Sequence, residues 1–481
     1  MTDLAAMRRR VLEAWAASPA RFREDANAEA DAAASPSLVA ELAQNALDAA
    51  LRAGVPGRLL VEVTDGVLYA ANTGAPLDEA GVEALCHLRA SSKTAGVGRY
   101  GVGFKAVLAY TSEPSIHSRA LSVGWSRSRT LAEVSALPSL AAEVARREGE
   151  VPVMRLPYDP PPDARAAALL AEYDTVVVLP LSAPVPLDDV DETLLLTLPL
   201  ESVTVNGRVV ALDPGWRTHT ASGPIPAALL ADRPVEERSR STWTVTVAAP
   251  PPGVAWTDRR LRAPQPTTEV VDVPVFLSVS VPLEPSRRHV VPGALTSWLV
   301  ERAAEAYVAF CESLPHSPDV LALLPSSLPA GPVDLALREA LAPLLPSARL
   351  FPGGRRGEES AVLDLGPASA RVTELLDLPQ LLPPAWLRPS LRALGVRVLD
   401  TADVVDLLHG LGSREPSWWA SLYAALGSAP DREALRALPV PLADGRVVTG
   451  PRGLLLADSP DVAAASDAAG LPLRWVHPDA C

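Results

Sequence analysis

The strongest constraint on this chain is a glycine-rich segment that leads directly into a predicted apolar helix at 104–110. Four glycines fall within eight residues: Gly96, Gly98, Gly101 and Gly103. A backbone without Cβ atoms can bend closely around an anion and direct several N–H groups at it. Lys93 and Lys105, the only lysines among the 43 basic residues, flank these glycines. The sequence therefore predicts a phosphate-binding loop in this segment.

Composition restricts the classes of protein to which the chain can belong. Its 481 residues exceed one typical domain, and a hydrophobic content of 48% is sufficient for packed cores. The formal net charge of −14 disfavours a nucleic-acid duplex as partner, because such a partner requires a basic face. The sequence has no apolar run typical of export or membrane spanning, and its three cysteines are scattered. We therefore expect a multidomain cytoplasmic protein without a membrane partner.

Helix and strand signals alternate over residues 1–200, which we expect to form one domain. Helices are expected at 4–20, 37–52, 77–89 and 126–148. Two apolar segments joined by Asp65-Gly66 indicate a β-hairpin of strands 59–64 and 67–71. Further strands are expected at 121–125, 151–156 and 175–179. This pattern predicts an α+β domain with helices over a mixed, largely antiparallel sheet.

Three further regions are expected after residue 200. They are a β-rich α/β middle domain, a linker rich in proline and leucine, and a smaller C-terminal α/β segment, at 201–315, 316–345 and 346–481. The middle domain contains a predicted helix at 295–314, and Trp418-Trp419 is a predicted core anchor of the last segment.

Three glycine motifs compete as explanations of the predicted loop. A P-loop requires Gly-Lys followed by Ser or Thr after a strand, whereas residues 103–106 read Gly-Phe-Lys-Ala. Residues 96–101 match the dinucleotide string Gly-x-Gly-x-x-Gly, but they follow a predicted helix and lie outside any βαβ unit. The pattern Gly-x-x-Gly-x-Gly at 98–103, opening a helix, indicates a flexible lid that meets phosphate with the positive end of a helix dipole.

Three polar residues recur on one face of the predicted helix at 37–52. Glu41, Asn45 and Asp48 are spaced four and three residues apart among alanines and leucines. A solvated polar stripe is the simpler explanation. In a nucleotide site, the Asn45 oxygen would suit Mg²⁺, which takes one or two protein oxygens besides phosphate and water. Glu41, one turn earlier, would then orient and deprotonate a water aimed at the γ-phosphate.

Two further polar motifs occur at strand ends. Asn72-Thr73-Gly74 follows the second hairpin strand, and Asp174-Thr175 precedes the apolar run at 176–179. Taken separately, these motifs are typical of an ordinary turn and of a strand start.

The order of these motifs over residues 20–180 resembles that of the Bergerat-fold (GHKL) ATPases. The motifs lie at 41–48, 72–74, 98–103 and 175. Glu-Leu-x-x-Asn-x-x-Asp-Ala and Gly-Arg-Tyr-Gly-Val-Gly-Phe are similar to motifs of the ninety-kilodalton heat-shock chaperones and of the ATP-binding region of sacsin. The resemblance implies a Bergerat two-layer α/β sandwich followed by a chaperone-like or sacsin-like middle domain.

The resemblance also implies roles for individual residues. Glu41 would be the general base, Asn45 the Mg²⁺ ligand, and Asp48 part of the base side of the pocket. The other residues that resemble nucleotide contacts of the family are Asn72, Gly74, Ser92, Lys93, Gly98, Gly101, Val102, Gly103, Phe104, Lys105 and Thr175. The family has an aspartate where this chain has Asn72. An amide can accept from adenine or donate to guanine, which leaves the preference between ATP and GTP open.

A pair of arginines in the second region is a further candidate. Arg287 and Arg288 lie in a charged segment after a predicted strand, and a surface turn is the simpler explanation. By resemblance to chaperone and sacsin-like middle segments, one of them would reach the γ-phosphate from outside the ATP-binding domain. A guanidinium suits phosphate because it donates in a fixed fork.

Together these observations predict a Mg²⁺-dependent, slow ATPase whose lid closure is coupled to a second domain, as in chaperone-like switches. The alternative is a nucleotide-sensing or scaffold module without turnover, which the Asn72 substitution favours. A histidine kinase is disfavoured because no histidine precedes His87. The expected partners are a nucleotide and a protein client or partner enzyme. The sequence leaves open the oligomeric state and whether the chain is part of a longer protein.

Overall fold

The computed structural model combines helices with several sheets, which confirms the expected α+β class. It describes residues 3–33, 38–86, 103–187, 190–231, 233, 238, 241–263, 265–284, 288–325, 327–411, 414–457, 462, 465 and 468–481. The chain divides into two compact units. The first consists of Met1–Val271, Val275–Ala306 and Ala330–Asp334, and the second of Asp272–Pro274, Tyr307–Pro329 and Leu335–Cys481.

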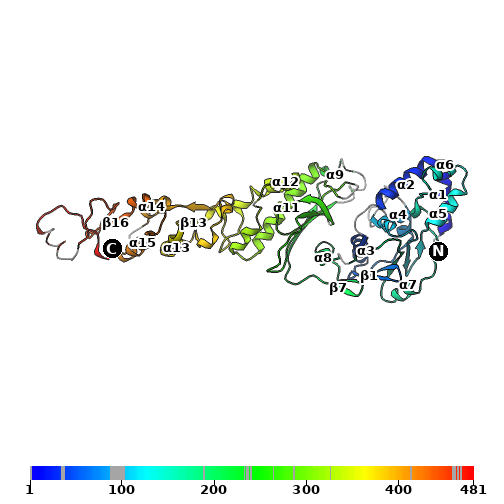
Figure 1. Cartoon of the computed structure of the whole chain (residues 1–481), viewed down its shortest axis with the longest axis horizontal. Coiled ribbons are helices and arrows are strands. Elements are labelled where there is room, and N and C mark those ends of the chain that lie inside the picture. Colours follow the sequence, from blue (N-terminus) through cyan, green and yellow to red (C-terminus); the bar gives the residue numbers. More distant parts are fainter. Residues whose placement is uncertain are drawn as a thin grey trace. The chain divides into compact units, whose positions relative to one another are not determined.

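A seven-stranded sheet lies at the centre of the N-terminal part of the first unit (Figure 1). Its strands are β1 (Arg58–Thr64), β2 (Val67–Asn72), β3 (Ser115–Ser118), β4 (Val123–Gly124), β5 (Thr175–Pro180), β6 (Ser202–Val205) and β7 (Arg208–Val210). Their order is β4-β3-β5-β2-β1-β6-β7, and only β1 and β6 pair in parallel among these neighbours. The sheet is therefore mixed and largely antiparallel, as predicted.

The predicted hairpin is confirmed as β1 and β2. The two strands pair from Leu59 opposite Asn72 to Thr64 opposite Val67. Asp65 and Gly66 both have positive φ, 50° and 76°, which is the turn geometry that matches the twist of paired strands. This register places Asn72 at the end of β2.

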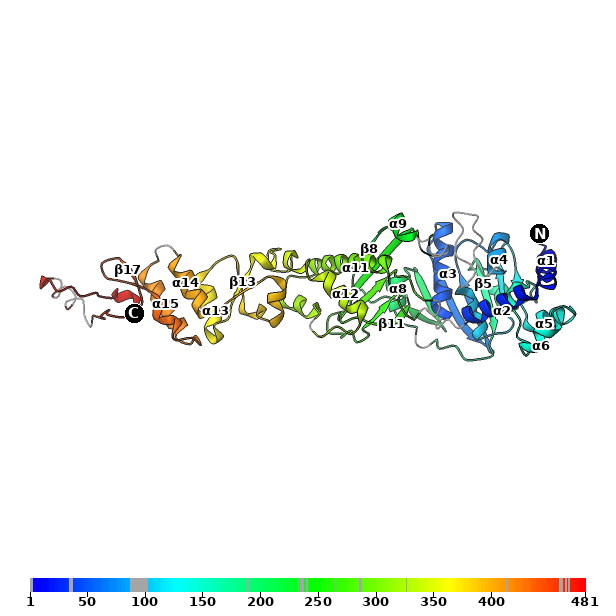
Figure 2. The same cartoon turned by 90° about the horizontal axis from the view of Figure 1, so that it is seen from above.

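Helices cover both faces of this sheet. They are α1 (Leu4–Ala17), α2 (Pro19–Ala33), α3 (Leu38–Ala53), α4 (Glu79–Cys86), α5 (Arg127–Ser135), α6 (Ala141–Arg146), α7 (Ala164–Leu169) and α8 (Thr193–Thr197), with the 3₁₀ helices η1 (Gly103–Ala109) and η2 (Val153–Arg155). In Figures 1 and 2, α1, α2, α5 and α6 lie together at the N-terminal end of this unit, and α3 lies against the sheet.

The alternation of side chains along β2 explains the two layers of helix. Leu68 and Ala70 enter the main core, which also contains buried residues of α1 to α4. Tyr69 and Ala71 point to the opposite face and pack in a second core with α7. Successive side chains of a strand face opposite sides, so one strand can serve both cores.

Local structure differs from the sequence prediction in three places. The expected strand at 151–156 contains η2, because its residues turn back so that Val153 and Met154 donate to Glu29. The expected helix at 126–148 is divided into α5 and α6, and the expected helix at 4–20 ends at Ala17 before Pro19 starts α2. A proline is favoured in the first turn of a new helix because its missing N–H is unused there.

A five-stranded sheet forms the remainder of the first unit. Its strands are β8 (Arg217–Pro224), β9 (Thr242–Ala249), β10 (Arg260–Arg262), β11 (Pro266–Val270) and β12 (Phe276–Val279), in the order β11-β10-β12-β9-β8. The short helix α9 (Ala227–Leu230) follows β8. The predicted helix at 295–314 is α11 (Ala294–Ser313), and the division between the two units falls within it.

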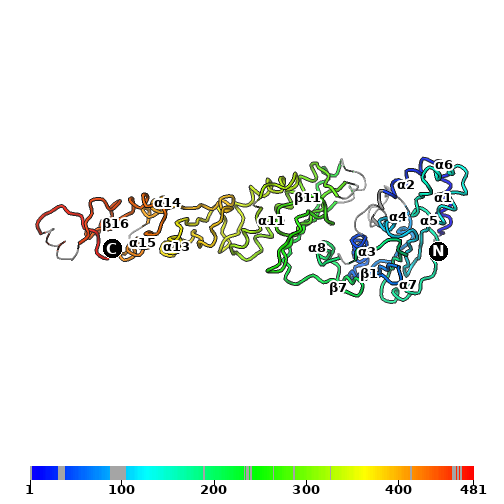
Figure 3. The backbone as a smooth tube through the Cα atoms, in the orientation of Figure 1, coloured from blue at the N-terminus to red at the C-terminus, as the bar shows by residue number. Residues whose placement is uncertain are grey.

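The second unit has its own hydrophobic core. Figure 3 traces its backbone in yellow to red. The region expected to be a linker contains η3 (Pro318–Leu323), α12 (Pro332–Leu341) and η4 (Leu345–Ser347). The elements that follow include a parallel sheet of β13 (Ala361–Leu363), β14 (Leu381–Leu382) and β15 (Arg397–Leu399), the helices α13 (Ser369–Leu376), α14 (Thr401–His409) and α15 (Pro416–Leu426), and the hairpin of β16 (Pro439–Pro441) and β17 (Val447–Thr449). Trp419 is buried in this core with Trp418 packed against it, as predicted.

Candidate functional site

A small cavity lies between α3, the central sheet and η1. Its apolar lining comes from Leu42, Leu59, Ala70, Leu77, Phe104, Ile116 and Val177. Three polar side chains complete it, those of Asn45, Asn72 and Thr175. The structure thus brings together residues from four sequence motifs that were singled out separately. A mostly apolar cavity with a few converging polar groups is the usual lining of a small-molecule site.

The cavity is contracted. It encloses about 30 Å³, far below the roughly 300 Å³ or more of a typical ligand pocket. A ring-shaped ligand could enter only if its walls moved apart. Phe104 belongs to the seven-residue helix η1, whereas most of the other lining residues belong to α3 or to sheet strands. The wall formed by η1 is short and belongs to no sheet, so its displacement would break no sheet hydrogen bond.

Asn72 and Thr175 are direct neighbours across two strands. They are paired in the register of β2 and β5, and the Asp174 N–H donates to the Asn72 carbonyl at 2.9 Å. Asn72 is buried, and its Nδ2 donates to the Thr73 carbonyl at 3.1 Å. Nδ2 has a second N–H, so the side chain keeps both a donor and the acceptor Oδ1.

Gly74 holds the loop after β2 against α3. Its φ is +132°, and a Cβ atom there would lie 2.4 Å from the carbonyl carbon of Ala49. The next residue, Ala75, donates from its N–H to the Ala49 carbonyl at 2.9 Å. Only glycine permits this close approach of backbone to backbone, so the position has a packing requirement of its own.

Asp174 organises the same loop, although its sequence position indicated only a strand start. Its Oδ2 accepts from the Gly74 N–H at 2.8 Å, and its Oδ1 pairs with Arg119 at 3.3 Å. Ser118 donates from Oγ to the Asp174 carbonyl at 3.2 Å and accepts from the Leu77 N–H at 2.9 Å. These bonds link β3, β5 and the loop, and so fix Asn72 and Thr175 beside the cavity.

The three polar residues of α3 have different surroundings. Asn45 lines the cavity, while Glu41, one turn earlier, is only 7% exposed and lies outside the lining. Asp48 accepts from the Gln44 side chain at 3.1 Å and is also outside the lining. The helix therefore separates the predicted metal ligand from the predicted general base by one turn.

Gln265 is a site residue that the sequence did not reveal. It lies in the turn between β10 and β11, and its Nε2 donates to Glu41 Oε1 at 3.4 Å. Its Oε1 is buried and has no hydrogen-bond partner within the described part of the chain. No sequence signal identified it, because an isolated glutamine between two prolines reads as an ordinary turn.

The strand before Gln265 is held by Arg262. This guanidinium pairs with Asp258 at 2.8 Å and donates to Thr193 Oγ1 at 3.4 Å. It also lies over the rings of Trp256 and Phe276, at 5.9 and 5.1 Å from their centroids. These contacts hold Arg262, the last residue of β10, in place. They therefore also fix the position at which the turn to Gln265 begins.

The remaining predicted residues divide into three groups. Ser92, Lys93, Gly98, Gly101, Val102 and Arg287 lie outside the described residues. Gly103 is the first residue of η1, and Phe104 faces the cavity. Arg288 is exposed, and its carbonyl accepts from the N–H and Oγ1 of Thr268, both at 2.8 Å.

Lys105 differs from its predicted surroundings. Its side chain is fully buried and is not among those that line the cavity. The charged groups that affect it include Glu29, Arg155 and Asp25, none of which belongs to a predicted motif. The structure therefore places Phe104 and Lys105, although adjacent, in different surroundings.

A preformed metal site is absent from the described residues. Within them, His, Cys, Asp and Glu side chains form no group of three or more that could hold a metal ion. The predicted ligand, Asn45, offers one amide oxygen at the cavity. One neutral oxygen suits Mg²⁺ only when phosphates and water supply the other ligands.

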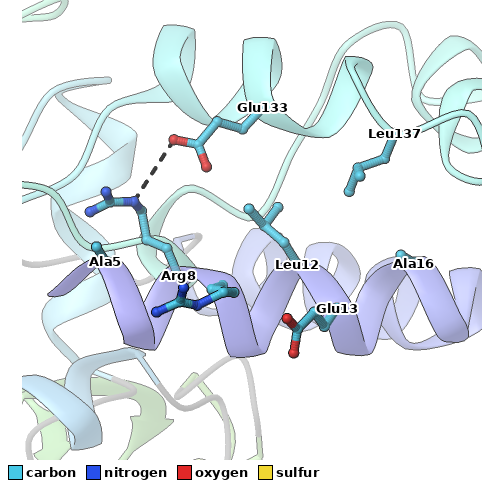
Figure 4. A pocket seen from close by; sticks show the side chains of 8 residues that line it. Ala5, Arg8, Leu12, Glu13, Ala16, Glu133 and Leu137 are labelled. Carbon is cyan, nitrogen blue, oxygen red and sulfur yellow. Dashed lines mark ion pairs between the residues drawn. The ribbon is translucent and has the colours of Figure 1, made fainter. Parts of the chain in front are cut away.

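A larger groove of about 320 Å³ lies between α1 and α5, with Leu12 and Leu137 on its two sides (Figure 4). Two of its charged groups, Arg8 and Glu133, are paired with each other. Arg8 approaches Glu133 at 3.8 Å, donates to the Pro157 carbonyl at 2.7 Å and lies over the Tyr158 ring. We therefore regard the smaller cavity, where separate motifs converge, as the candidate site.

Comparison with known proteins does not assign the chain to a family. No protein-family model matches it. No curated protein matches its sequence. The resemblance to Bergerat-fold ATPases therefore rests on the motifs themselves. In addition, none of the helices in the described segments is long and apolar enough to cross a membrane.

Proposed function

We propose that the first unit binds ATP with Mg²⁺ and hydrolyses it slowly, as a chaperone-like conformational switch. The observation that carries the proposal is the convergence of Asn45, Asn72, Phe104 and Thr175 on one cavity. These residues come from four motifs spread over about 130 residues, and their order resembles that of Bergerat-fold ATPases. A cytoplasmic location and a protein client or partner enzyme belong to the same proposal.

The cavity lining suits a purine base. Leucine, isoleucine and valine side chains offer apolar surface on which a planar base could pack. Asn72 offers Oδ1 at the strand end. That oxygen would accept from the exocyclic amino group of adenine, whereas guanine presents a carbonyl in the corresponding place. The second Nδ2 hydrogen could donate to that carbonyl, so the amide is compatible with either base. Because the cavity is contracted, part of the binding free energy would be used to move its walls apart.

Asn45 and Glu41 would act on the phosphate side. When bound, Mg²⁺ would neutralise phosphate charge and orient the γ-phosphate, with Asn45 as its protein ligand. Glu41 would take the proton of the attacking water, and Gln265 would hold the Glu41 carboxylate in place. Residues 98–103 remain a phosphate loop predicted from sequence.

A nucleotide-sensing module without turnover is the second candidate. The observation that favours it is the position of Glu41, which is buried, engaged by Gln265 and outside the cavity lining. In this case the same binding residues would report nucleotide occupancy to the second sheet.

Two measurements test the proposal. They are calorimetry with ATP, ADP and GTP, with and without Mg²⁺, and an assay of phosphate release. Asn72→Leu should weaken ATP binding at least about tenfold, or about 1.4 kcal/mol, through loss of the acceptor. Asn27→Leu, at an exposed position on α2 outside the lining, is the matched control and should bind normally. Glu41→Gln should retain binding and lose hydrolysis.

Two results would decide against these assignments. If the wild-type protein fails to bind ATP at millimolar concentration, the nucleotide proposal is wrong. If it binds ATP, but Glu41→Gln and the wild type release phosphate at the same rate, the sensing module replaces the ATPase.

A further inference from the structure

The loop at 73–77 connects two residues that line the candidate cavity. Asn72, at the end of β2, precedes the loop, and Leu77 is its last residue. Both side chains are buried. The loop forms no helix or strand, so its backbone groups must find their hydrogen-bond partners on other elements. Those partners decide where Asn72 and Leu77 lie.

Each N–H group of this loop has an acceptor. Thr73 and Ala75 donate to backbone carbonyls of β1 and α3, at 3.1 and 2.9 Å. Pro76 has no N–H group. The two remaining donors, on Gly74 and Leu77, are bound by side chains from outside the loop. These side chains take the place of the regular pairing that the loop lacks.

Asp174 and Ser118 supply the two side-chain acceptors. Asp174 Oδ2 accepts from the Gly74 N–H at 2.8 Å, and Ser118 Oγ accepts from the Leu77 N–H at 2.9 Å. The two residues are also joined to each other, because Ser118 Oγ donates to the Asp174 carbonyl at 3.2 Å. Ser118 is the last residue of β3, and Asp174 directly precedes β5, with which β3 pairs. We call this pair of residues the clasp.

The clasp also holds the loop where it leaves β2. The Asp174 N–H donates to the Asn72 carbonyl at 2.9 Å, next to the last pair of the β2–β5 register. Asp174 therefore binds the chain on both sides of Thr73, at Asn72 through its backbone and at Gly74 through its carboxylate. Together these bonds fix the direction in which the chain turns away from the sheet.

The same carboxylate has a second, weaker interaction. Arg119 Nη1 lies 3.3 Å from Asp174 Oδ1, but the Arg119 side chain is 52% exposed. Exposed ion pairs contribute little, because water and salt screen them. The bond from Gly74 joins a backbone donor to a charged acceptor, which is a stronger type of hydrogen bond. We therefore expect the acceptor oxygen of Asp174 to matter more than its ion pair.

The clasp distinguishes two walls of the contracted cavity. The wall at Asn72 and Leu77 is bonded through the loop to β1, β3, β5 and α3. The wall at Phe104 belongs to η1, which is part of no sheet. Entry of a ligand would therefore displace η1 and leave the bonded wall in place. A wall that keeps its position is preorganised for recognition, because no binding free energy is used to order it.

We propose that Asp174 and Ser118 are positioning residues that set the base side of the nucleotide cavity. Neither is among the residues that line the cavity, and both act through the loop backbone on Asn72 and Leu77. The clasp presents the Asn72 amide to the edge of the base at a fixed position. This consequence rests on the proposed nucleotide function, whereas the holding of the loop is independent of it.

Hydrogen exchange of residues 72–77 without nucleotide tests the clasp directly. Asp174→Ala removes the acceptor of the Gly74 N–H and should increase exchange of this segment several-fold. Ser118→Ala should have a similar effect, because the two residues of the clasp are bonded to each other. Asp174→Asn keeps an oxygen acceptor and should stay within about twofold of the wild type. Glu172→Ala, which removes an exposed carboxylate from the same turn, is the matched control and should exchange like the wild type.

Calorimetry with ATP and with CTP tests the consequence for the base. The two nucleotides have the same triphosphate, so the ratio of their Kd values isolates the contribution of the base. In Asp174→Ala, the Kd for ATP should rise about tenfold and the Kd for CTP less, which moves the ratio toward one. Asp174→Asn should restore the wild-type ratio, and Glu172→Ala should not change it. A general loosening of the domain would weaken both nucleotides equally and leave the ratio unchanged.

The outcomes separate the clasp from the proposed function. Equal exchange of residues 72–77 in Asp174→Ala and Glu172→Ala would overturn the clasp, whether or not a nucleotide binds. Equal Kd ratios in these two variants, in a protein that binds ATP, would overturn its role at the base. Absence of ATP binding by the wild type would overturn the proposed function, and the exchange data would then decide the clasp alone. If Asp174→Ala fails to fold, Ser118→Ala decides by the same comparisons.

Discussion

At the scale of single residues, the candidate site depends on close backbone packing as much as on polar side chains. Gly74 approaches the Ala49 carbonyl carbon so closely that even one methyl group would collide with it. The N–H of Gly74 donates to the Asp174 carboxylate. The next residue, Ala75, donates from its N–H to the Ala49 carbonyl. A change at Gly74 therefore affects both α3 and the loop that carries Asn72.

Gly74→Ala should destabilise the first unit by about 2–4 kcal/mol, because it combines a steric clash with an unfavourable positive φ. It should also weaken nucleotide binding, since α3 and β2 would separate. Urea denaturation and calorimetry measure the two effects.

Gly66→Ala is the matched control for this substitution. Gly66 also has a positive φ, +76°, but a Cβ there would meet no atom within 4 Å. Its cost should be about 1–2 kcal/mol, the conformational penalty alone. If the two variants are equally stable, the close packing of Gly74 against α3 does not contribute.

At the scale of elements, the turn between β10 and β11 connects the second sheet to Glu41. Gln265 supplies the contact, and Arg262 fixes the strand that leads to it. The sequence directed attention to Arg287 and Arg288 for a contribution from this region. The structure shows a glutamine at the predicted general base, in the turn between β10 and β11.

Gln265→Ala should slow phosphate release about tenfold while changing the Kd for ATP less than twofold. The carboxylate of Glu41 would keep its chemistry but lose a group that orients it. Steady-state phosphate release and calorimetry give the two quantities. Gln380→Ala, an exposed glutamine in the second unit, is the control and should change neither.

Gln265→Glu provides a sharper test of this contact. A second carboxylate beside Glu41 would raise the pKa of one of the pair, so the rate profile should move to higher pH. An unchanged profile in this variant, together with an unchanged rate in Gln265→Ala, would show that Gln265 has no part in hydrolysis.

At the scale of the whole molecule, the two compact units have separate hydrophobic cores. Each core contains an aromatic pair, Trp15 with Phe22 in the first unit and Trp418 with Trp419 in the second. Domains with their own cores commonly unfold as separate steps. A single unfolding transition is therefore not expected for this chain.

Trp419→Ala should destabilise the second unit by about 3–5 kcal/mol, because it removes a large buried side chain. Calorimetric unfolding should show one transition displaced to lower temperature and the other unchanged, with normal ATP binding. Leu85→Ala, in the core of the first unit, should displace the other transition. If either variant displaces both transitions equally, the units do not unfold independently.

Local sequence was sufficient to predict the elements that carry the site. The Asp65-Gly66 turn, the helix that became α3 and the strand at Thr175 follow from turn residues, caps and periodicity, and all three are confirmed. Local sequence did not predict the 3₁₀ helix η2, because its apolar run resembles that of a strand. There, the backbone geometry is decided by Glu29, which lies more than 120 residues earlier in the chain.

The sequence by itself thus determined the α+β class, the central hairpin and the spacing of the polar motifs, because these depend on interactions between near neighbours. Only the tertiary structure decided which of those residues share a cavity. It placed Gln265 against Glu41 and buried Lys105 outside the cavity lining. Such contacts join residues far apart in the chain, and their position is set by the packing of whole elements rather than by local preference.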